Sequence, residues 1–145
     1  MMRENFKTKF KTPFEFVISW LRAANAPVKQ TGTIARTLTE MGQPIYMCDV
    51  PTGYSDQAEA WLDPGVMAYR WECSVNYTQV LAKRGAVSPQ VESWKKLPPR
   101  KMAEKVRNML IPGEPVESAV SMLMKGEGLR GMAQLALGSP AFQQQ

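Results

Sequence analysis

Residues 41–77 read MGQPIYMCDVPTGYSDQAEAWLDPGVMAYRWECSVNY and divide the chain into an N-terminal and a C-terminal part. The first half of this segment is rich in residues that favour turns, and the Pro-Thr-Gly sequence at 51–53 is its clearest turn signal. Asp63 and Pro64 then combine a helix-capping residue with a proline suited to the first helical position. We therefore expect an irregular loop that is followed by a long helix over residues 64–84.

Apolar side chains recur along this predicted helix at intervals of three and four residues, which is the spacing of one helix face. One apolar stripe consists of Val66, Tyr69, Cys73, Tyr77 and Val80, and an adjoining stripe consists of Met67, Trp71 and Val75. A helix that is apolar over so much of its surface contacts neighbours on several sides. We expect this helix to lie at the centre of the fold.

A second clear helix start lies near the N-terminus. Thr12 is a good N-cap residue, and it is followed by Pro13 at the first helical position and by Glu15 at the third. This arrangement is a capping box, and the helix that it starts should end near Asn25, because Pro27 disfavours helix just before it.

Shorter amphipathic patterns, separated by proline and glycine, predict the remaining helices. They cover residues 31–41, 56–61, 89–97, 100–110, 116–123, 129–136 and 139–142. For the helix that ends at Trp61, Ser55 or Asp56 is the expected cap, and Asp56 would form a second capping box with Glu59. The sequence predicts an all-α fold, a single compact domain of about six to eight short helices with proline-punctuated loops.

The first eleven residues follow a different pattern, in which basic residues alternate with apolar or neutral ones. The alternating residues are Phe6, Thr8 and Phe10 on one side and Lys7, Lys9 and Lys11 on the other. A period of two predicts a short extended segment, and a single strand is not stable without a partner. We expect either a frayed arm or a partner outside this chain. The chain then divides into an extended basic arm at 1–11 and a helical domain at 12–145.

Composition excludes several kinds of chemistry. The 145 residues are enough for one domain with a sizeable core, but they include no histidine. Histidine is the usual general base near neutral pH and the commonest metal ligand, so histidine-dependent triads and histidine-ligated zinc or haem sites are excluded within this chain. We expect no catalytic residue, no metal site and no cofactor, and we do not expect this chain to be an enzyme by itself.

The chain has no run of about 18 apolar residues, so we expect no membrane span. Its basic N-terminus is not followed by an apolar segment, so the chain as it stands has no secretory signal and is expected in the cytoplasm.

The net charge of +5 permits weak attraction to nucleic acid. The candidate phosphate contacts are Lys95, Lys96, Arg100, Lys101, Lys105 and Arg107. Glu104 interrupts this basic face, and Trp94 is the one aromatic residue beside it, so we expect solvated helix faces and consider nucleic-acid binding unlikely on these grounds.

Cys48 and Cys73 are too far apart for a Cys-x-x-Cys motif and too few for a zinc site of four cysteines. They are either buried free thiols, which is common for cysteine, or the two halves of one disulfide. Their spacing alone does not decide between the two.

The loop before the long helix offers a candidate ligand cleft, because loops on a rigid scaffold often carry function. The candidate ligand-binding residues are Gln43, Tyr54, Asp56, Trp61 and Arg70, with Trp71 as a further apolar wall. Arg70 would contact an anion and the aromatic rings would form the walls. In the alternative, the loop packs as a lid over the first helix, Trp61 fills the core and Arg70 pairs with an acid.

Four acidic residues of the same region could bind calcium through their oxygens. They are Asp49, Asp56, Glu59 and Asp63. Their spacing is not that of an EF-hand, and both Asp56 and Asp63 are explained as helix caps. We therefore interpret these residues as structural.

Several of these motifs together resemble the C-terminal part of a bacterial family called "domain of unknown function 1800". The matching motifs are TPFEFV at 12–17, MGQP at 41–44, PTGY at 51–54, AWLDPG at 60–65 and LGSPAFQ at 137–143. With the segments between them, they cover about half of the chain in the right order. The resemblance implies a largely helical protein without an established activity.

Members of that family are typically several times longer, and many look exported to the bacterial envelope. They are encoded beside another uncharacterised family that resembles sulfatases. The resemblance implies that this chain corresponds to a C-terminal fragment, located in the envelope or periplasm if it is cut from an exported precursor. Its partner would be the missing N-terminal portion or an equivalent subunit of the same system.

The leading hypothesis for function is therefore a non-catalytic docking or structural C-terminal portion of a larger protein. A first alternative is that the domain contributes ligand-binding residues to an enzyme site formed with a missing N-terminal portion. A second alternative is a weak basic nucleic-acid binder.

Overall fold

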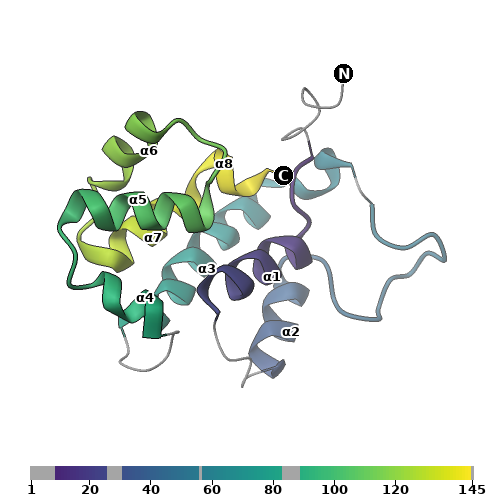
Figure 1. The fold of residues 1–145 in the computed structure, drawn as a ribbon. Helices are drawn as coiled ribbons and strands as arrows, with labels where there is room; N and C mark the ends of the chain where they lie inside the picture. Colours follow the sequence, from purple (N-terminus) through teal and green to yellow (C-terminus); the bar gives the residue numbers. More distant parts are fainter. Residues whose placement is uncertain (1–8, 26–30, 56, 83–88, 145) are drawn as a thin grey trace.

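Eight α-helices and one short 3₁₀ helix, η1, form the part of the chain that this computed structural model describes (Figure 1). The described residues are 9–25, 31–55, 57–82 and 89–144. The elements are α1 (Pro13–Ala24), α2 (Thr31–Glu40), η1 (Ala58–Trp61), α3 (Pro64–Ala82), α4 (Pro89–Trp94), α5 (Pro99–Leu110), α6 (Val116–Leu123), α7 (Gly128–Gly138) and α8 (Pro140–Gln143). The predicted all-α fold is confirmed. Within the described ranges, no helix is both long enough and apolar enough to cross a membrane.

Helix α1 begins with the capping box that the sequence predicts. The Thr12 side chain accepts a hydrogen bond from the Glu15 amide at 3.3 Å, and the Glu15 carboxylate accepts one from the Thr12 amide at 2.8 Å. Asn25, in a left-handed conformation with φ of 46°, ends the helix where expected. Both signals are local in sequence, and this is why they could be recognised without the fold.

The start of α3 is also as expected. The Asp63 carboxylate accepts hydrogen bonds from the amides of Gly65 at 2.8 Å and Val66 at 3.2 Å, which satisfies free donors of the first turn. The helix ahead of it differs from the prediction: η1 is a single 3₁₀ turn whose N-cap, Gln57, makes no side-chain capping bond. Asp56, the expected partner of Glu59 in a capping box, lies outside the described residues.

The sequence pattern predicts that α3 lies at the centre of the fold. In the structure, the helix with the most extensive packing is instead α7. Helix α7 packs against α3, α5, α6 and α8. Small side chains explain this position, since Ala133 and Ala136 are completely buried and Gly131 and Gly138 allow neighbours to approach closely. Helix α3 packs along one side of α7 and also contacts α2 (Figure 1).

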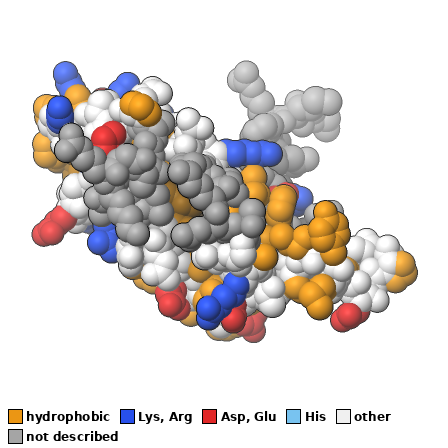
Figure 2. Space-filling view, turned by 90° about the horizontal axis from the view of Figure 1, so that it is seen from below, with side chains coloured by type: hydrophobic (Ala, Val, Ile, Leu, Met, Phe, Trp, Pro, Cys, Tyr) orange, Lys and Arg blue, Asp and Glu red, His pale blue; other side chains and the backbone are white. Residues whose placement is uncertain are grey.

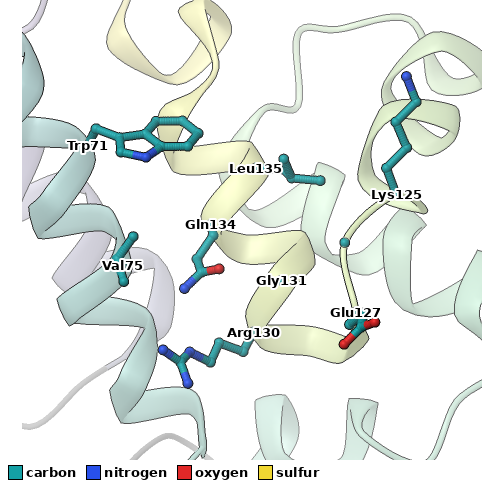
Figure 3. A pocket seen from close by; sticks show the side chains of 9 residues that line it. Trp71, Val75, Lys125, Glu127, Arg130, Gly131, Gln134 and Leu135 are labelled. Carbon is teal, nitrogen blue, oxygen red and sulfur yellow. The ribbon is translucent and has the colours of Figure 1, made fainter.

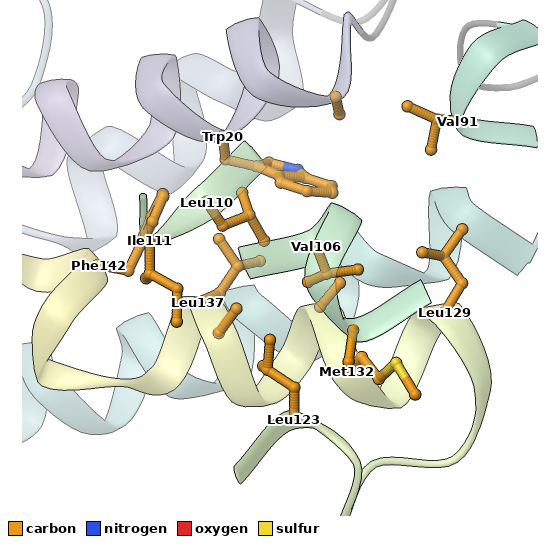
Figure 4. Close-up of a cluster of buried hydrophobic side chains, with 14 of the residues drawn as sticks. Trp20, Val91, Val106, Leu110, Ile111, Leu123, Leu129, Met132, Leu137 and Phe142 are labelled. Atoms are coloured by element: carbon orange, nitrogen blue, oxygen red, sulfur yellow. The ribbon is translucent and has the colours of Figure 1, made fainter. Parts of the chain in front are cut away.

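The hydrophobic core is formed mainly by α1, α5, α6, α7 and α8, and α2, α3 and α4 add one or two buried residues each (Figure 4). Its fully or almost fully buried members include Trp20, Val106, Leu123, Met132, Leu137 and Phe142. The Phe142 ring meets the Phe16 ring edge to face, with centroids 5.6 Å apart. Truncation of one such aliphatic residue to alanine typically costs about 2–5 kcal/mol of folding free energy, so this cluster stabilises the domain.

The most deeply buried face of α3 is polar. Arg70, Ser74 and Thr78 are spaced by four residues, and each is at most 1% exposed. The hydroxyl groups bond within the helix: Ser74 Oγ donates to the Trp71 carbonyl at 2.7 Å, and Thr78 Oγ1 donates to the Ser74 carbonyl at 2.9 Å. Hydroxyls that are satisfied in this way can be buried at little cost. The apolar pattern of the sequence gave no indication of this face.

The last residues of the predicted extended arm find their partner inside the chain. Phe10 forms an antiparallel bridge with Gln144, and the Lys11 amide donates to the Gln143 carbonyl at 2.7 Å. The N-terminal and C-terminal ends of the described chain therefore lie side by side (Figure 1). For Phe10 and Lys11, the expectation of a frayed arm or of a partner outside the chain is wrong. Residues 1–8 lie outside the described part.

Candidate functional site

The projecting loop, residues 42–55, leaves the body of the domain between α2 and η1 (Figure 1). Its base is held by two hydrogen bonds. Gln43 Oε1 accepts from the Phe14 amide at 2.8 Å, and the Tyr54 hydroxyl donates to the Pro44 carbonyl at 2.6 Å. Partial burial, with Cys48 and Asp49 nearby, raises the pKa of Tyr54, which keeps the phenol protonated as a donor.

The far end of this loop presents apolar side chains to solvent. Tyr46 is fully exposed and Met47 is 71% exposed, and Ile45 and Val50 are also exposed. Figure 2 shows hydrophobic side chains gathered along the projection and beside its base. Tyr46 has a φ of 60°, in the left-handed region that tyrosine rarely adopts. An anchored base with a strained, apolar tip is typical of a binding loop.

The candidate ligand residues of the sequence analysis separate into two places. Gln43, Tyr54 and Trp61 come together at the base of the loop, where the Tyr54 and Trp61 rings lie 6.3 Å apart and Trp61 Nε1 donates to the Ser55 carbonyl at 2.8 Å. Trp61 is buried, as the lid alternative expected, but the loop projects and does not cover α1. The position of Asp56 is outside the described residues.

Arg70 lies elsewhere, at the junction of the two chain ends. Its Nη1 donates to Gln143 Oε1 at 3.0 Å and its Nη2 donates to the Lys11 carbonyl at 2.8 Å. The guanidinium also lies over the rings of Phe10 and Phe16, 4.7 and 5.4 Å from their centroids. Among the described residues, no carboxylate bonds to it, so the expected acid partner is replaced by a carbonyl, an amide and two aromatic rings.

Burying the charged guanidinium of Arg70 costs free energy, and its hydrogen bonds and ring contacts offset this cost only in part. Its Nε has no hydrogen-bond partner among the described residues, and desolvation lowers the pKa of Arg70 to about 10. Lys11 lies beside it, with Nζ 3.8 Å from the centre of the Phe142 ring. Burial also lowers the pKa of Lys11 to about 8, an effect that Glu15 opposes and Arg70 reinforces. We call this cluster, made of Phe10, Lys11, Arg70, Phe142 and Gln143, the cationic clasp, since it fixes both chain ends to α3.

A hollow of about 490 Å³ opens between α3 and α7 (Figure 3). Its walls are formed by Trp71 and Val75 of α3, by Arg130, Gly131, Gln134 and Leu135 of α7, and by Lys125, Gly126 and Glu127 of the turn before α7. Sequence reasoning identified Trp71 as an apolar wall but associated it with the loop. The spacing of Arg130, Gln134 and Gly138 by four residues is the signal that could have located the opposite wall.

Of the four acidic residues considered for calcium binding, Asp56 lies outside the described residues. Asp63 caps α3, whereas Asp49 and Glu59 are exposed. Across the described ranges, no three side chains of histidine, cysteine, aspartate or glutamate come close enough together to hold a metal ion.

Half of the basic residues considered for phosphate binding interact with nearby acids or carbonyls. Lys95 pairs with Glu92 at 2.9 Å, Arg100 pairs with Glu117 at 2.9 Å, and Arg107 Nε donates to the Glu114 carbonyl at 3.0 Å. The other three, Lys96, Lys101 and Lys105, are exposed.

Both cysteines are free thiols, Cys73 buried and Cys48 partly exposed. Burial raises the pKa of Cys73 to about 11, so this thiol is protonated at neutral pH and is a poor nucleophile.

The described residues form a helical domain with a projecting apolar loop. The chain belongs to the family described as Protein of unknown function (DUF1800), whose model matches residues 1–144. The resemblance inferred from the motifs is thereby confirmed, and the match covers much more of the chain than those motifs do. No curated protein and no solved structure shows significant similarity to it.

Proposed function

We propose that this chain is a non-catalytic docking domain, which packs its projecting loop against another part of a larger protein of its family. The observation that carries the proposal is the exposure of Tyr46 and Met47 at the end of a loop whose base is anchored. An isolated soluble domain gains nothing from holding large apolar side chains in water, whereas contiguous exposed apolar residues commonly mark interaction sites.

The partner surface should be apolar and concave. Complete burial of a side chain such as Met47 or Val50 contributes roughly 1.5–3 kcal/mol relative to exposure. The loop is also partly organised in advance, because Gln43 and Tyr54 hold its two ends, and this reduces the entropy lost on docking. The partner would be the N-terminal portion of a longer family polypeptide or an equivalent subunit.

The proposal is tested by a binding titration between this chain and the separately produced N-terminal portion of a longer family member. A triple variant, Tyr46→Ser, Met47→Ser and Val50→Ser, should weaken the complex about 100-fold, since apolar anchors dominate interface energetics. The measurement is isothermal titration calorimetry, and a negative heat-capacity change should accompany binding of the unaltered chain.

The matched control is a Val116→Ser, Met124→Ser variant at α6 and its C-cap, where the two apolar side chains are 45% and 50% exposed. This variant should bind like the unaltered chain. Equal weakening by the loop and α6 variants, or no binding by the unaltered chain, would contradict the docking proposal.

A further inference from the structure

We propose that the hollow between α3 and α7 is a binding site for a compact organic anion, with an apolar or aromatic body against Trp71 and a carboxylate at Arg130. This site lies on elements other than the projecting loop, so the inference is independent of the docking proposal. It rests on an aromatic wall, on the charged side chain of Arg130, which pairs with no other side chain in the described ranges, and on the size of the hollow.

The position of the Trp71 ring, which forms the aromatic wall, depends on the glycine at position 138. A Cβ atom added at Gly138 would lie 1.9 Å from the Trp71 ring, so the indole occupies space that only glycine leaves free at this position. Trp71 is nevertheless 52% exposed. A large ring that is held on one side and open on the other offers a flat apolar surface for a ligand.

Arg130 lies at the end of the hollow opposite Trp71, and Lys125 lies apart from it on the turn before α7 (Figure 3). The side chains of Arg130 and Lys125 both line the hollow, and neither makes a hydrogen bond or ion pair with another side chain in the described ranges. Glu127 also lines the hollow, so the three side chains together carry one net positive charge. This balance favours a monoanion such as a carboxylate over a phosphate dianion.

The spacing of these groups defines the length of the ligand. Figure 3 shows Trp71 and Arg130 toward opposite ends of the hollow, with Gln134 between them. Arg130 and Gly138 are eight residues apart on one helix, which corresponds to about 12 Å along its axis. A ligand would therefore have an apolar body joined to a carboxylate by a few bonds, and Gln134 could hydrogen-bond a polar group between them.

The volume of the hollow is sufficient for a small-molecule ligand. A volume of about 490 Å³ lies within the usual range of roughly 300–1,000 Å³ for small-molecule sites. Val75 and Leu135 extend the apolar lining, while Arg130 offers the planar donor group that best fits a carboxylate. The hollow thus combines an apolar surface with a small number of polar groups that fix orientation.

The test is a titration of the full chain with 4-phenylbutyrate, followed by ¹H–¹⁵N NMR of the tryptophan indole groups. The Trp71 signal is assigned by its loss in a Trp71→Phe variant. We expect saturable shifts of the Trp71 indole and of the Gln134 side-chain amide, with much smaller changes at Trp20, Trp61 and Trp94, which are buried.

The variant Arg130→Gln should weaken binding about tenfold, because a charge-assisted hydrogen bond is lost. Arg130 is exposed, so this variant should fold normally, and an unchanged melting temperature would verify that. The control is Arg36→Gln at an exposed position of α2, which should leave binding unchanged. Acetate and 4-phenylbutan-1-ol should each bind more weakly than 4-phenylbutyrate.

Three results would overturn the proposal: no saturable shift at Trp71, equal binding by the Arg130→Gln variant, or equal binding by the neutral alcohol. The first would show that the hollow does not bind this class of ligand. The second and third would show that the site does not recognise the carboxylate.

Discussion

The projecting loop and the buried face of α3 invert the usual distribution of side chains. In the loop, Tyr46 and Met47 are apolar and exposed, whereas on α3 the guanidinium of Arg70 is charged and buried. Hydropathy by itself would predict the reverse at each position. The α3 face is stabilised by contacts within the chain. The loop is held only at its base among the contacts of the described residues, and the exposure of its tip is the basis of the docking proposal.

The largest expected effect comes from removing the centre of the cationic clasp. Arg70→Ala should lower the free energy of unfolding by about 3 kcal/mol, because it leaves a cavity and removes the donors to Gln143 Oε1 and the Lys11 carbonyl. Arg70→Met should cost less, since it retains most of the volume and removes a desolvated charge. Urea unfolding would measure both values, and an alanine variant within 0.5 kcal/mol of the unaltered chain, roughly the range of surface substitutions, would contradict this role.

A smaller effect is expected from Lys11, and it depends on pH. Its folded pKa of about 8 lies below the ordinary value of 10.5, so between these pH values the unfolded chain binds more protons than the folded one. The destabilisation that Lys11 causes is fully present below about pH 8 and disappears as the pH rises toward 10.5. Lys11→Met should therefore be more stable than the unaltered chain by about 1–2 kcal/mol at pH 7.

The stability difference between Lys11→Met and the unaltered chain should shrink steadily from pH 8 to 10. Burial raises the pKa values of Cys73 and Tyr77 to about 11 and 12, so these groups make the folded chain less stable as the pH rises. Both groups are present in the variant and in the unaltered chain. Their effect therefore cancels in the difference between the two free energies of unfolding. Thermal unfolding at a series of pH values would measure it. A difference that does not change with pH would mean that Lys11 is not desolvated as its position indicates.

The smallest effect is expected at the tip of the loop. Tyr46→Asn should raise the free energy of unfolding by about 0.5–1 kcal/mol, because asparagine tolerates the left-handed conformation and the exposed tyrosine ring contributes no packing. Chemical unfolding would measure this value. A loss of stability by the variant would show that the ring packs on the domain, and the contrast between the loop and α3 would then disappear.

The sequence predicts those features that depend on neighbouring residues. The capping box of Thr12 with Glu15 and the Asp63 cap of α3 are both confirmed. They could be predicted because donor and acceptor lie within three residues of each other. The sequence analysis grouped Gln43, Tyr54 and Trp61 as candidate ligand residues, but it did not predict that Gln43 would bond to the Phe14 amide, 29 positions away.

The sequence does not predict contacts between residues that are far apart along the chain. Arg70 bonds to Gln143 across 73 positions, and Trp71 packs on Gly138 across a similar distance. Burial of Arg70 depends on residues from both ends of the described chain. The hollow beside Trp71 depends on how α3 packs against α7. No local pattern carries either kind of information, so both the clasp and the hollow required the fold.

The docking proposal is tested most directly by the reactivity of Met47 toward hydroxyl radicals. The oxidation rate is compared between the purified chain and the species present in the source cell. Met124, the C-cap residue of α6, serves as the internal control because it is 50% exposed. The account predicts that Met47 is oxidised rapidly in the purified chain and is protected in the cellular species, while Met124 reacts alike in both. Equal reactivity of Met47 in the two samples would contradict the account.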